Sequence, residues 1–240
     1  MIFDPPLISG KLVKRYKRFL ADVILDNGET VVAHCANSGS MMGLKDEGSL
    51  VWLSPNQNPK AKLDWRWELA SQDGALVGIN TSRPNAIVAD AIINGEIPEL
   101  KSYANLRREV KYGHNSRIDI LLEGDTKPNC YVEVKSVTLR RPDGPDPKAV
   151  EFPDSVTTRG AKHLKELSDM VSTGHRAVMF YLIQRQDCDH FRLASDIDSG
   201  YKAAFDKART AGVEVICYSC TVTPEEITLN KPIKFIAPLT

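Results

Sequence analysis

Three charged residues lie within two apolar runs of the sequence, where charged side chains are unexpected. Asp119 belongs to RIDILL, and Glu133 and Lys135 stand two positions apart in YVEVK. An ionised group among core-forming residues is costly unless it is paired, bound to a metal or placed at the open end of a strand. We therefore interpret these three residues as a candidate site.

The residue types in this set suggest hydrolysis of a phosphodiester. Side chains alternate across a strand, so Glu133 and Lys135 point to the same face, and Asp119 can reach that edge if the two runs pair. Neighbouring carboxylates repel each other unless a cation neutralises them, and hard oxygen ligands suit Mg²⁺ or Mn²⁺. With a lysine to orient water or balance charge on the phosphate, the set predicts metal-assisted attack of water.

An ordinary ion pair between exposed strands would show the same spacing, and such pairs contribute little to stability. The position of the set favours a site, because the two acids lie on consecutive expected strands. An expected helix at 84–97 precedes these strands, and an amphipathic one at 153–174 follows them.

Residues 7–80 are expected to form a small β-barrel. Two runs rich in Val, Ile and Leu flank Asn27-Gly28, a pairing typical of a hairpin turn. Further strand-like segments are 49–56, 62–70 and 75–82. Several short strands with almost no helix favour an OB-type fold, although a β-sandwich would give a similar pattern.

The pattern changes at Arg83-Pro84, where a helical period begins with proline and ends at Gly95. Strand-like segments, the amphipathic helix and a further strand–helix–strand series follow. This order predicts a mixed sheet with helices on both faces. We expect two domains, a nucleic-acid-binding barrel over 1–82 and a domain of the α/β (α+β) class over 83–240.

Composition and charge set limits on the class of protein. Lys plus Arg and Asp plus Glu are equal at 31 each, so net charge alone does not indicate a polyanion partner. No apolar run approaches the roughly 20 residues that span a bilayer, so we expect no membrane association. The first residues lack the apolar region of a signal peptide, and the 5 cysteines fit reduced thiols, so we expect a cytoplasmic protein.

One basic run stands out against this neutral background. The segment KLVKRYKR carries five cations and no acid: Lys11, Lys14, Arg15, Lys17 and Arg18. It is typical of a solvated strand edge, where lysines discourage association between sheets. It is equally consistent with a surface that follows a phosphate backbone, with Tyr16 and Phe19 available to stack on bases.

Several long segments resemble the sugar fermentation stimulation protein A family, in the same order and over nearly the whole chain. They include GKLVKRYKRFLADV, HCANSGSM, LRREVKYGHNSRIDILL, CYVEVKSVTL and FPDSVTTRGAKHL. The resemblance implies an OB-fold domain followed by a PD-(D/E)XK nuclease-like domain, and binding of DNA with little sequence preference. It also implies that Asp119 and Glu133 hold the metal and that Lys135 completes the catalytic set.

Accessory residues follow from the same comparison. Glu109 in RREVKY is either a fourth acid or a structural partner of an arginine. Arg159, Lys162 and His163 lie at the start of the helix after the site, where a phosphate is favoured, although an amphipathic helix would also carry such residues on its solvated face. Ala61 in NPKAKL departs from the family pattern NPKRKL and removes a cation from the barrel.

Two functions remain open at this point. One is a Mg²⁺- or Mn²⁺-dependent deoxyribonuclease. The other is a non-specific DNA-binding regulator of sugar (maltose) metabolism that inherits the nuclease fold and cuts little or not at all. Because the chain is neutral overall, a homodimer that enlarges the DNA-binding surface is also open.

Overall fold

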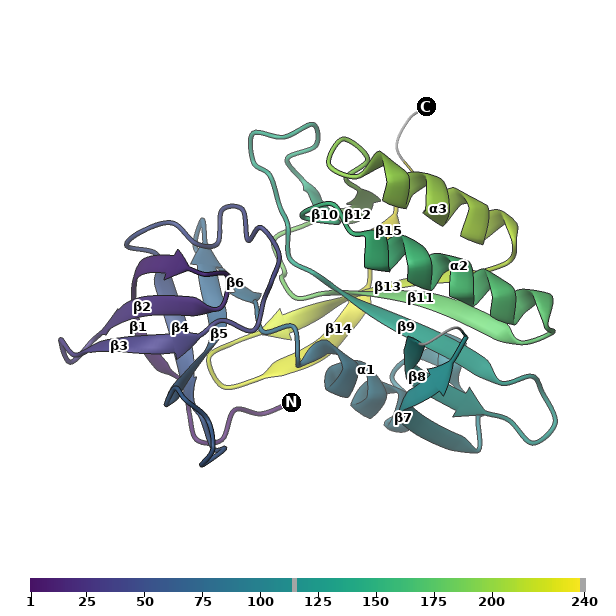
Figure 1. Cartoon of the computed structure of the whole chain (residues 1–240), viewed down its shortest axis with the longest axis horizontal. Coiled ribbons are helices and arrows are strands. Elements are labelled where there is room, and N and C mark those ends of the chain that lie inside the picture. Colours follow the sequence, from purple (N-terminus) through teal and green to yellow (C-terminus); the bar gives the residue numbers. More distant parts are fainter. Residues whose placement is uncertain (114–115, 238–240) are drawn as a thin grey trace.

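The first part of the chain curls into a β-barrel in the computed structural model, which describes residues 1–113 and 116–237 (Figure 1). The sheet order is β3-β2-β1-β4-β5-β6, and β3 also pairs with β5, which closes a ring of β1 to β5. This confirms the OB-type expectation. The strands are β1 Ile8–Tyr16, β2 Leu20–Leu25, β3 Thr30–His34, β4 Leu50–Pro55, β5 Trp65–Gln72 and β6 Ala75–Gly78.

In the barrel strands, buried and exposed positions follow the alternation of apolar and polar residues in the sequence, with one local exception. In β2, Ala21, Val23 and Leu25 are buried while the residues between them are not. The expected turn at Asn27-Gly28 joins β2 to β3, with Gly28 at φ 87. The exception is the basic run, which is divided between β1 and a turn where Lys17 and Arg18 adopt φ 47 and φ 64.

The second part is built on a mixed sheet of six strands in the order β14-β13-β11-β9-β8-β7. Strand β11 runs parallel to β9 and β13, and the other pairs are antiparallel. The strands are β7 Asn105–Tyr112, β8 Ser116–Glu123, β9 Cys130–Val137, β11 Arg176–Ile183, β13 Glu214–Val222 and β14 Ile227–Pro232.

Helices cover both faces of this sheet, as expected (Figure 1). Helix α1 (Pro84–Ile93) packs with one buried cluster, and α2 (Thr158–Ser172) and α3 (Ser199–Thr210) pack with the other. The short 3₁₀ helix η1 (Pro98–Leu100) follows α1. Among the described residues, no helix is both long enough and apolar enough to cross a membrane.

Two details of the expected elements differ. Helix α2 begins at residue 158 and not 153, because Thr157 caps it by accepting a hydrogen bond from the Gly160 amide at 3.0 Å. A small parallel sheet of β10 (Ala149–Phe152), β12 (His190–Leu193) and β15 (Lys234–Phe235) was not expected. These strands are short and far apart in sequence.

Polar links, one of them through a buried glutamate, join the barrel to the second domain. Glu68 of β5 is 1% exposed and accepts hydrogen bonds from Ser54, Asn80 and Arg83 at 2.5 to 2.9 Å. The Asp154 carboxylate accepts from the Met41 amide at 3.2 Å. The contact between Arg83 and Glu68 holds the start of α1 against the barrel.

Candidate active site

Strands β8 and β9 separate where the acidic residues lie. Their pairing runs from Leu122↔Cys130 to Ile120↔Val132 and ends there. Beyond that point the Val134 amide donates to the Asp119 carboxylate at 2.7 Å, and Asn85 of α1 donates to the other oxygen at 2.7 Å. The carboxylate thus takes the place of a backbone acceptor in the ladder.

Glu133 is buried beside this opening, with one oxygen satisfied and one without a partner. It is 2% exposed, and its Oε1 accepts from Lys135 Nζ at 2.7 Å and from His163 Nδ1. Its Oε2 has no hydrogen-bond partner among the described residues. Because buried polar atoms are nearly always paired, this oxygen indicates a place for a ligand.

A histidine and an arginine support Glu133 from helix α2. Arg159 Nε donates to His163 Nε2 at 3.3 Å, which assigns the ring proton to Nδ1, where it bonds Glu133. His163 is buried, at 6% exposed. The ring therefore fixes the orientation of the carboxylate.

The two acids have opposite pKa shifts. Burial, and then the charge of Glu133, raise the pKa of Asp119 to about 6, against the hydrogen bond from Val134. Burial also acts to raise the pKa of Glu133, but Lys135 and His163 outweigh it and hold that pKa below its ordinary value. A metal-free site therefore keeps Glu133 ionised and disfavours charge on Asp119.

This raised pKa predicts a pH-dependent cost to folding without metal. An acid whose folded pKa exceeds its unfolded value holds protons more tightly when folded, so its contribution to stability falls as the pH rises from about 4 to above 6. Relative to Asp119→Asn, the wild type should lose about 2 kcal/mol of unfolding free energy between about pH 4.5 and pH 7.5 in EDTA. Urea denaturation at both pH values measures this, and parallel profiles would contradict it.

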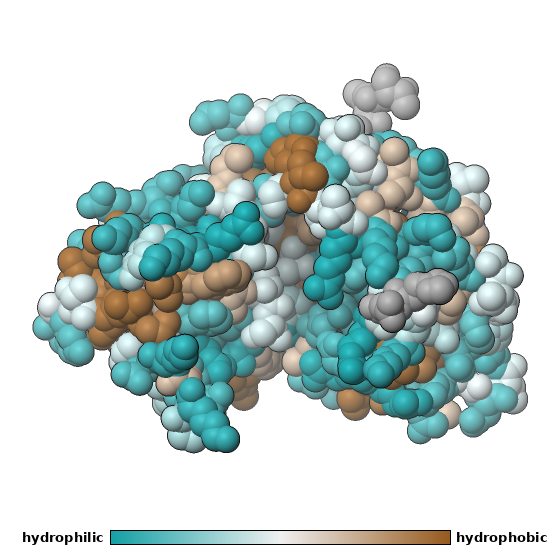
Figure 2. Space-filling model, in the orientation of Figure 1, coloured by the Kyte–Doolittle hydropathy of each residue, from teal (hydrophilic) through white to brown (hydrophobic). Residues whose placement is uncertain are grey.

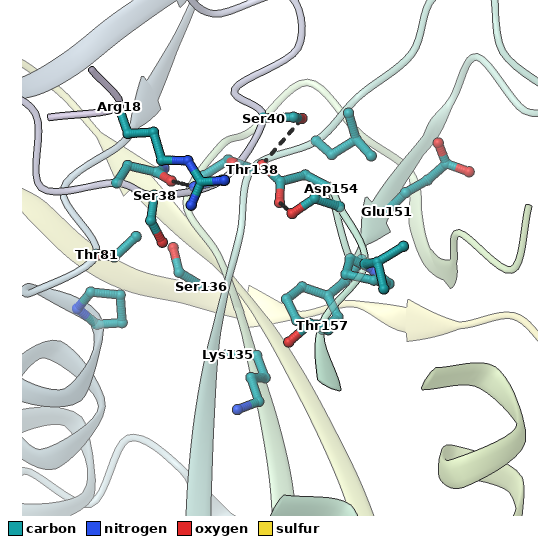
Figure 3. Close-up of a pocket in the computed structure, with 18 of the residues that line it drawn as sticks. Arg18, Ser38, Ser40, Thr81, Lys135, Ser136, Thr138, Glu151, Asp154 and Thr157 are labelled. Atoms are coloured by element: carbon teal, nitrogen blue, oxygen red, sulfur yellow. Dashed lines mark hydrogen bonds between the residues drawn. The ribbon is translucent and has the colours of Figure 1, made fainter. Parts of the chain in front are cut away.

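A pocket of about 870 Å³ lies between the barrel and the second domain and reaches Lys135. Figure 3 shows Arg18 of the barrel and Lys135 of β9 at its sides, with Thr157 at the start of α2. The Lys135 side chain is 13% exposed, and its ammonium contacts Glu133 at 2.7 Å and lies 3.3 Å from His163 Nδ1.

A second pocket of about 730 Å³ lies on the other side of the site. Asp119 and His163 line it, together with Arg108 and Lys162. Thr81 and Asn85 line both pockets. Lys135 therefore borders one pocket and Asp119 the other, and the buried Glu133, which contacts Lys135, lines neither.

The structure places the expected accessory residues around the second pocket. Glu109 is exposed at φ 55, and Asn85 contacts its carboxylate at 3.4 Å; Arg117 donates to its backbone carbonyl. The register of β7 and β8 on either side places Glu109 opposite Asp119. Arg159 and Lys162 border the second pocket, and Lys162 also pairs with Glu166 at 3.5 Å.

The basic run is only partly directed to the site. Arg15 and Arg18 line the first pocket, and Arg15 donates to the Asn37 carbonyl at 2.7 Å. Lys14 lies against the barrel, 3.6 Å from Asp22. Lys11 and Lys17 are exposed residues that do not line either pocket.

Sequence reasoning missed residues that approach the site from distant elements. Asn85 orients Asp119, and Glu166 is 5% exposed behind the second pocket, where it accepts from Ser116 at 2.9 Å. Asn85 stands just after the helix-starting proline, but nothing local shows that α1 lies beside β8. Glu166 stands one turn after His163, which is the one signal that could have found it.

The donor set fits a cation of the Mg²⁺ type. Residues 1–113 and 116–237 contain no group of three or more His, Cys, Asp and Glu side chains arranged to hold a metal by themselves. Mg²⁺ commonly binds through one or two carboxylates and completes its shell with water and phosphate oxygens. Asp119 and the unpaired oxygen of Glu133 meet that requirement.

The closed barrel and the mixed-sheet domain with helices on both faces define a two-domain protein, an OB-type barrel followed by an α/β domain. The chain belongs to the sugar fermentation stimulation protein family. The family model for the sugar fermentation stimulation protein RE domain matches residues 82–226, and that for the SfsA N-terminal OB domain matches residues 13–79.

Individual relatives agree with this assignment. The sugar fermentation stimulation protein homolog of Rhodospirillum rubrum is 55% identical in an alignment of 249 positions that covers 99% of this chain and 100% of the relative. That of Paramagnetospirillum magneticum is 54% identical and covers 97% of each chain. A solved structure of Pyrococcus furiosus SfsA in complex with Ca²⁺ has a TM-score of 0.88 at 23% identity, covering 98% of each chain, which establishes the shared fold.

Proposed function

We propose that this protein is a DNA-binding, divalent-metal-dependent deoxyribonuclease. The observation that carries the proposal is the unpaired buried oxygen of Glu133, a residue that contacts Lys135 at the edge of one pocket and whose charge acts on Asp119 at the edge of the other. A relative with the same fold has been solved with Ca²⁺, a cation that also prefers oxygen ligands.

Each residue of the site has a role in this proposal. Asp119 and Glu133 would hold Mg²⁺ or Mn²⁺, which lowers the pKa of water and offsets charge on the phosphate. Lys135 is anchored by Glu133 at 2.7 Å and faces the first pocket, where its ammonium can orient a water molecule. Asn85 and His163 keep the two carboxylates in place.

Cleavage of DNA with and without metal tests the proposal. Purified protein with Mn²⁺ or Mg²⁺ is expected to shorten single-stranded or duplex DNA, and excess EDTA is expected to stop the reaction. Re-addition of Mn²⁺ should restore cleavage, because EDTA removes only the cation and leaves the acids that hold it in the folded protein. Failure of well-folded protein to cut any DNA at any metal concentration would contradict the proposal.

A second candidate is DNA binding without cleavage, in a protein that regulates sugar metabolism. The observation in its favour is that, without any metal, the Lys135 ammonium already offsets the charge of Glu133 and His163 donates a hydrogen bond to it. Such a protein would bind DNA equally well in EDTA and in Mn²⁺, with an affinity that falls steeply with salt, by a slope of about −0.9 for each phosphate neutralised on duplex DNA. Fluorescence anisotropy beside the cleavage assay separates the two candidates.

A further inference from the structure

The two pockets adjoin and form one continuous track, in which each pocket is one arm. The candidate site lies between the two arms and not at an end of the track. Lys135 faces the pocket between the domains, while Asp119 and His163 face the pocket formed with β7 and α2. Thr81 and Asn85 belong to both pockets, so the two spaces adjoin at the site. Figure 2 shows the surface hollowed between the barrel and the second domain, with hydrophilic residues beside the hollow.

Each arm of this track has room for a nucleotide. The volumes of about 870 and 730 Å³ lie within the range of about 300–1,000 Å³ in which pockets enclose drug-sized ligands. A strand that crossed the site could therefore keep a nucleotide on both sides of the reacting phosphate. An enzyme that accepted only strand ends would need one arm to be closed.

Each arm also offers an exposed cation. Arg18 borders the first pocket and Arg108 borders the second. Within the described part of the chain, neither guanidinium forms a hydrogen bond or an ion pair. Arg18 is held in a turn at φ 64, a conformation that residues other than glycine rarely adopt. Cations at both ends are suited to phosphates on both sides of the site.

We infer that the substrate is an internal phosphodiester of a strand that passes through both pockets, so the enzyme is an endonuclease. This inference rests on the proposed nuclease function. Water adds to the phosphorus, the bond from phosphorus to one ester oxygen breaks, and that oxygen takes up a proton. One such event converts a closed circle into a linear strand with one phosphate end and one hydroxyl end.

A circular single-stranded DNA and its linear form, compared in Mn²⁺, test the inference. We expect both to be cut at similar rates, with the circle first becoming a full-length linear strand. Degradation of the linear form alone, with release of mononucleotides, would overturn the inference and leave the nuclease function standing. If neither form is cut, both are overturned.

Charge reversals in the two arms provide a second readout. Arg18→Glu and Arg108→Glu should each lower cleavage of the circle at least about fivefold, because each removes a phosphate contact and adds a repulsive charge. Lys234→Glu, an exposed lysine of β15 outside both pockets, is the matched control and should cut at the wild-type rate. A wild-type rate for either arm variant would show that the strand does not occupy that arm and would overturn the inference.

Discussion

Glu133→Gln is expected to lower metal-dependent DNA cleavage by about 100-fold or more. Glutamine keeps the shape of the side chain and can still accept from Lys135 and His163, but it removes the negative charge and replaces one oxygen with an amide nitrogen. Substitutions that only support a metal ligand commonly cost about 10–100-fold, so loss of a ligand itself should cost at least as much. Initial cleavage rates at saturating Mn²⁺ measure the effect.

The matched control for this variant is Glu123→Gln. Glu123 lies at the far end of β8, and its side chain is 31% exposed and pairs with Arg107 at 3.2 Å. The Glu123→Gln variant loses the same charge from the same sheet but far from the site, so its cleavage rate should stay near that of the wild type. Equal cleavage rates for the wild type and Glu133→Gln would show that Glu133 takes no part in the reaction. Thermal unfolding in EDTA checks that both variants fold.

Arg185→Met is expected to cause the largest loss of stability, about 3–5 kcal/mol. Arg185 is 0% exposed and donates to Asp187 at 2.7 Å, to the Thr138 carbonyl at 2.7 Å and to Gln72 of the barrel at 2.9 Å. Methionine fills a similar volume but leaves those acceptors without their donor. Because Gln72 belongs to β5, the substitution should also weaken the contact between the barrel and the second domain.

Chemical denaturation of Arg185→Met, compared with Arg107→Met, measures this effect. The Arg107 side chain is 59% exposed, and its pair with Glu123 is of the surface type, so its removal should cost less than about 1 kcal/mol. A loss below that value for Arg185→Met would mean that the buried guanidinium does not stabilise the fold. Arg185→Lys should fall between the two, since an ammonium cannot form the same fork of hydrogen bonds.

Much of the architecture could be predicted from sequence because its signals are local. Alternation in 20–34 and the Asn27-Gly28 turn predicted the barrel hairpin, and the apolar period after Pro84 predicted α1. The turn at Lys17 and Arg18 could not be predicted, because its residues adopt left-handed backbone conformations without being glycine or asparagine. The small sheet of β10, β12 and β15 could not be predicted, because its strands pair only with segments far away in the sequence.

In the candidate site, too, some features could be predicted from the sequence and others could not. Parity along β9 correctly placed Glu133 and Lys135 together, and they contact at 2.7 Å. The separation of β8 from β9 could not be predicted, because it depends on a carboxylate that replaces a backbone acceptor. Nor could the approach of Asn85, since it depends on how α1 packs against the sheet.

Anomalous scattering from a Mn²⁺-soaked crystal tests the central claim most directly. Two anionic side chains on diverging strands are proposed to seat a cation at Glu133 Oε2, a buried oxygen without a hydrogen-bond partner among the described residues. We expect a single strong peak within bonding distance of Glu133 Oε2 and the Asp119 carboxylate. A well-diffracting crystal at saturating Mn²⁺ with no peak there would contradict the account.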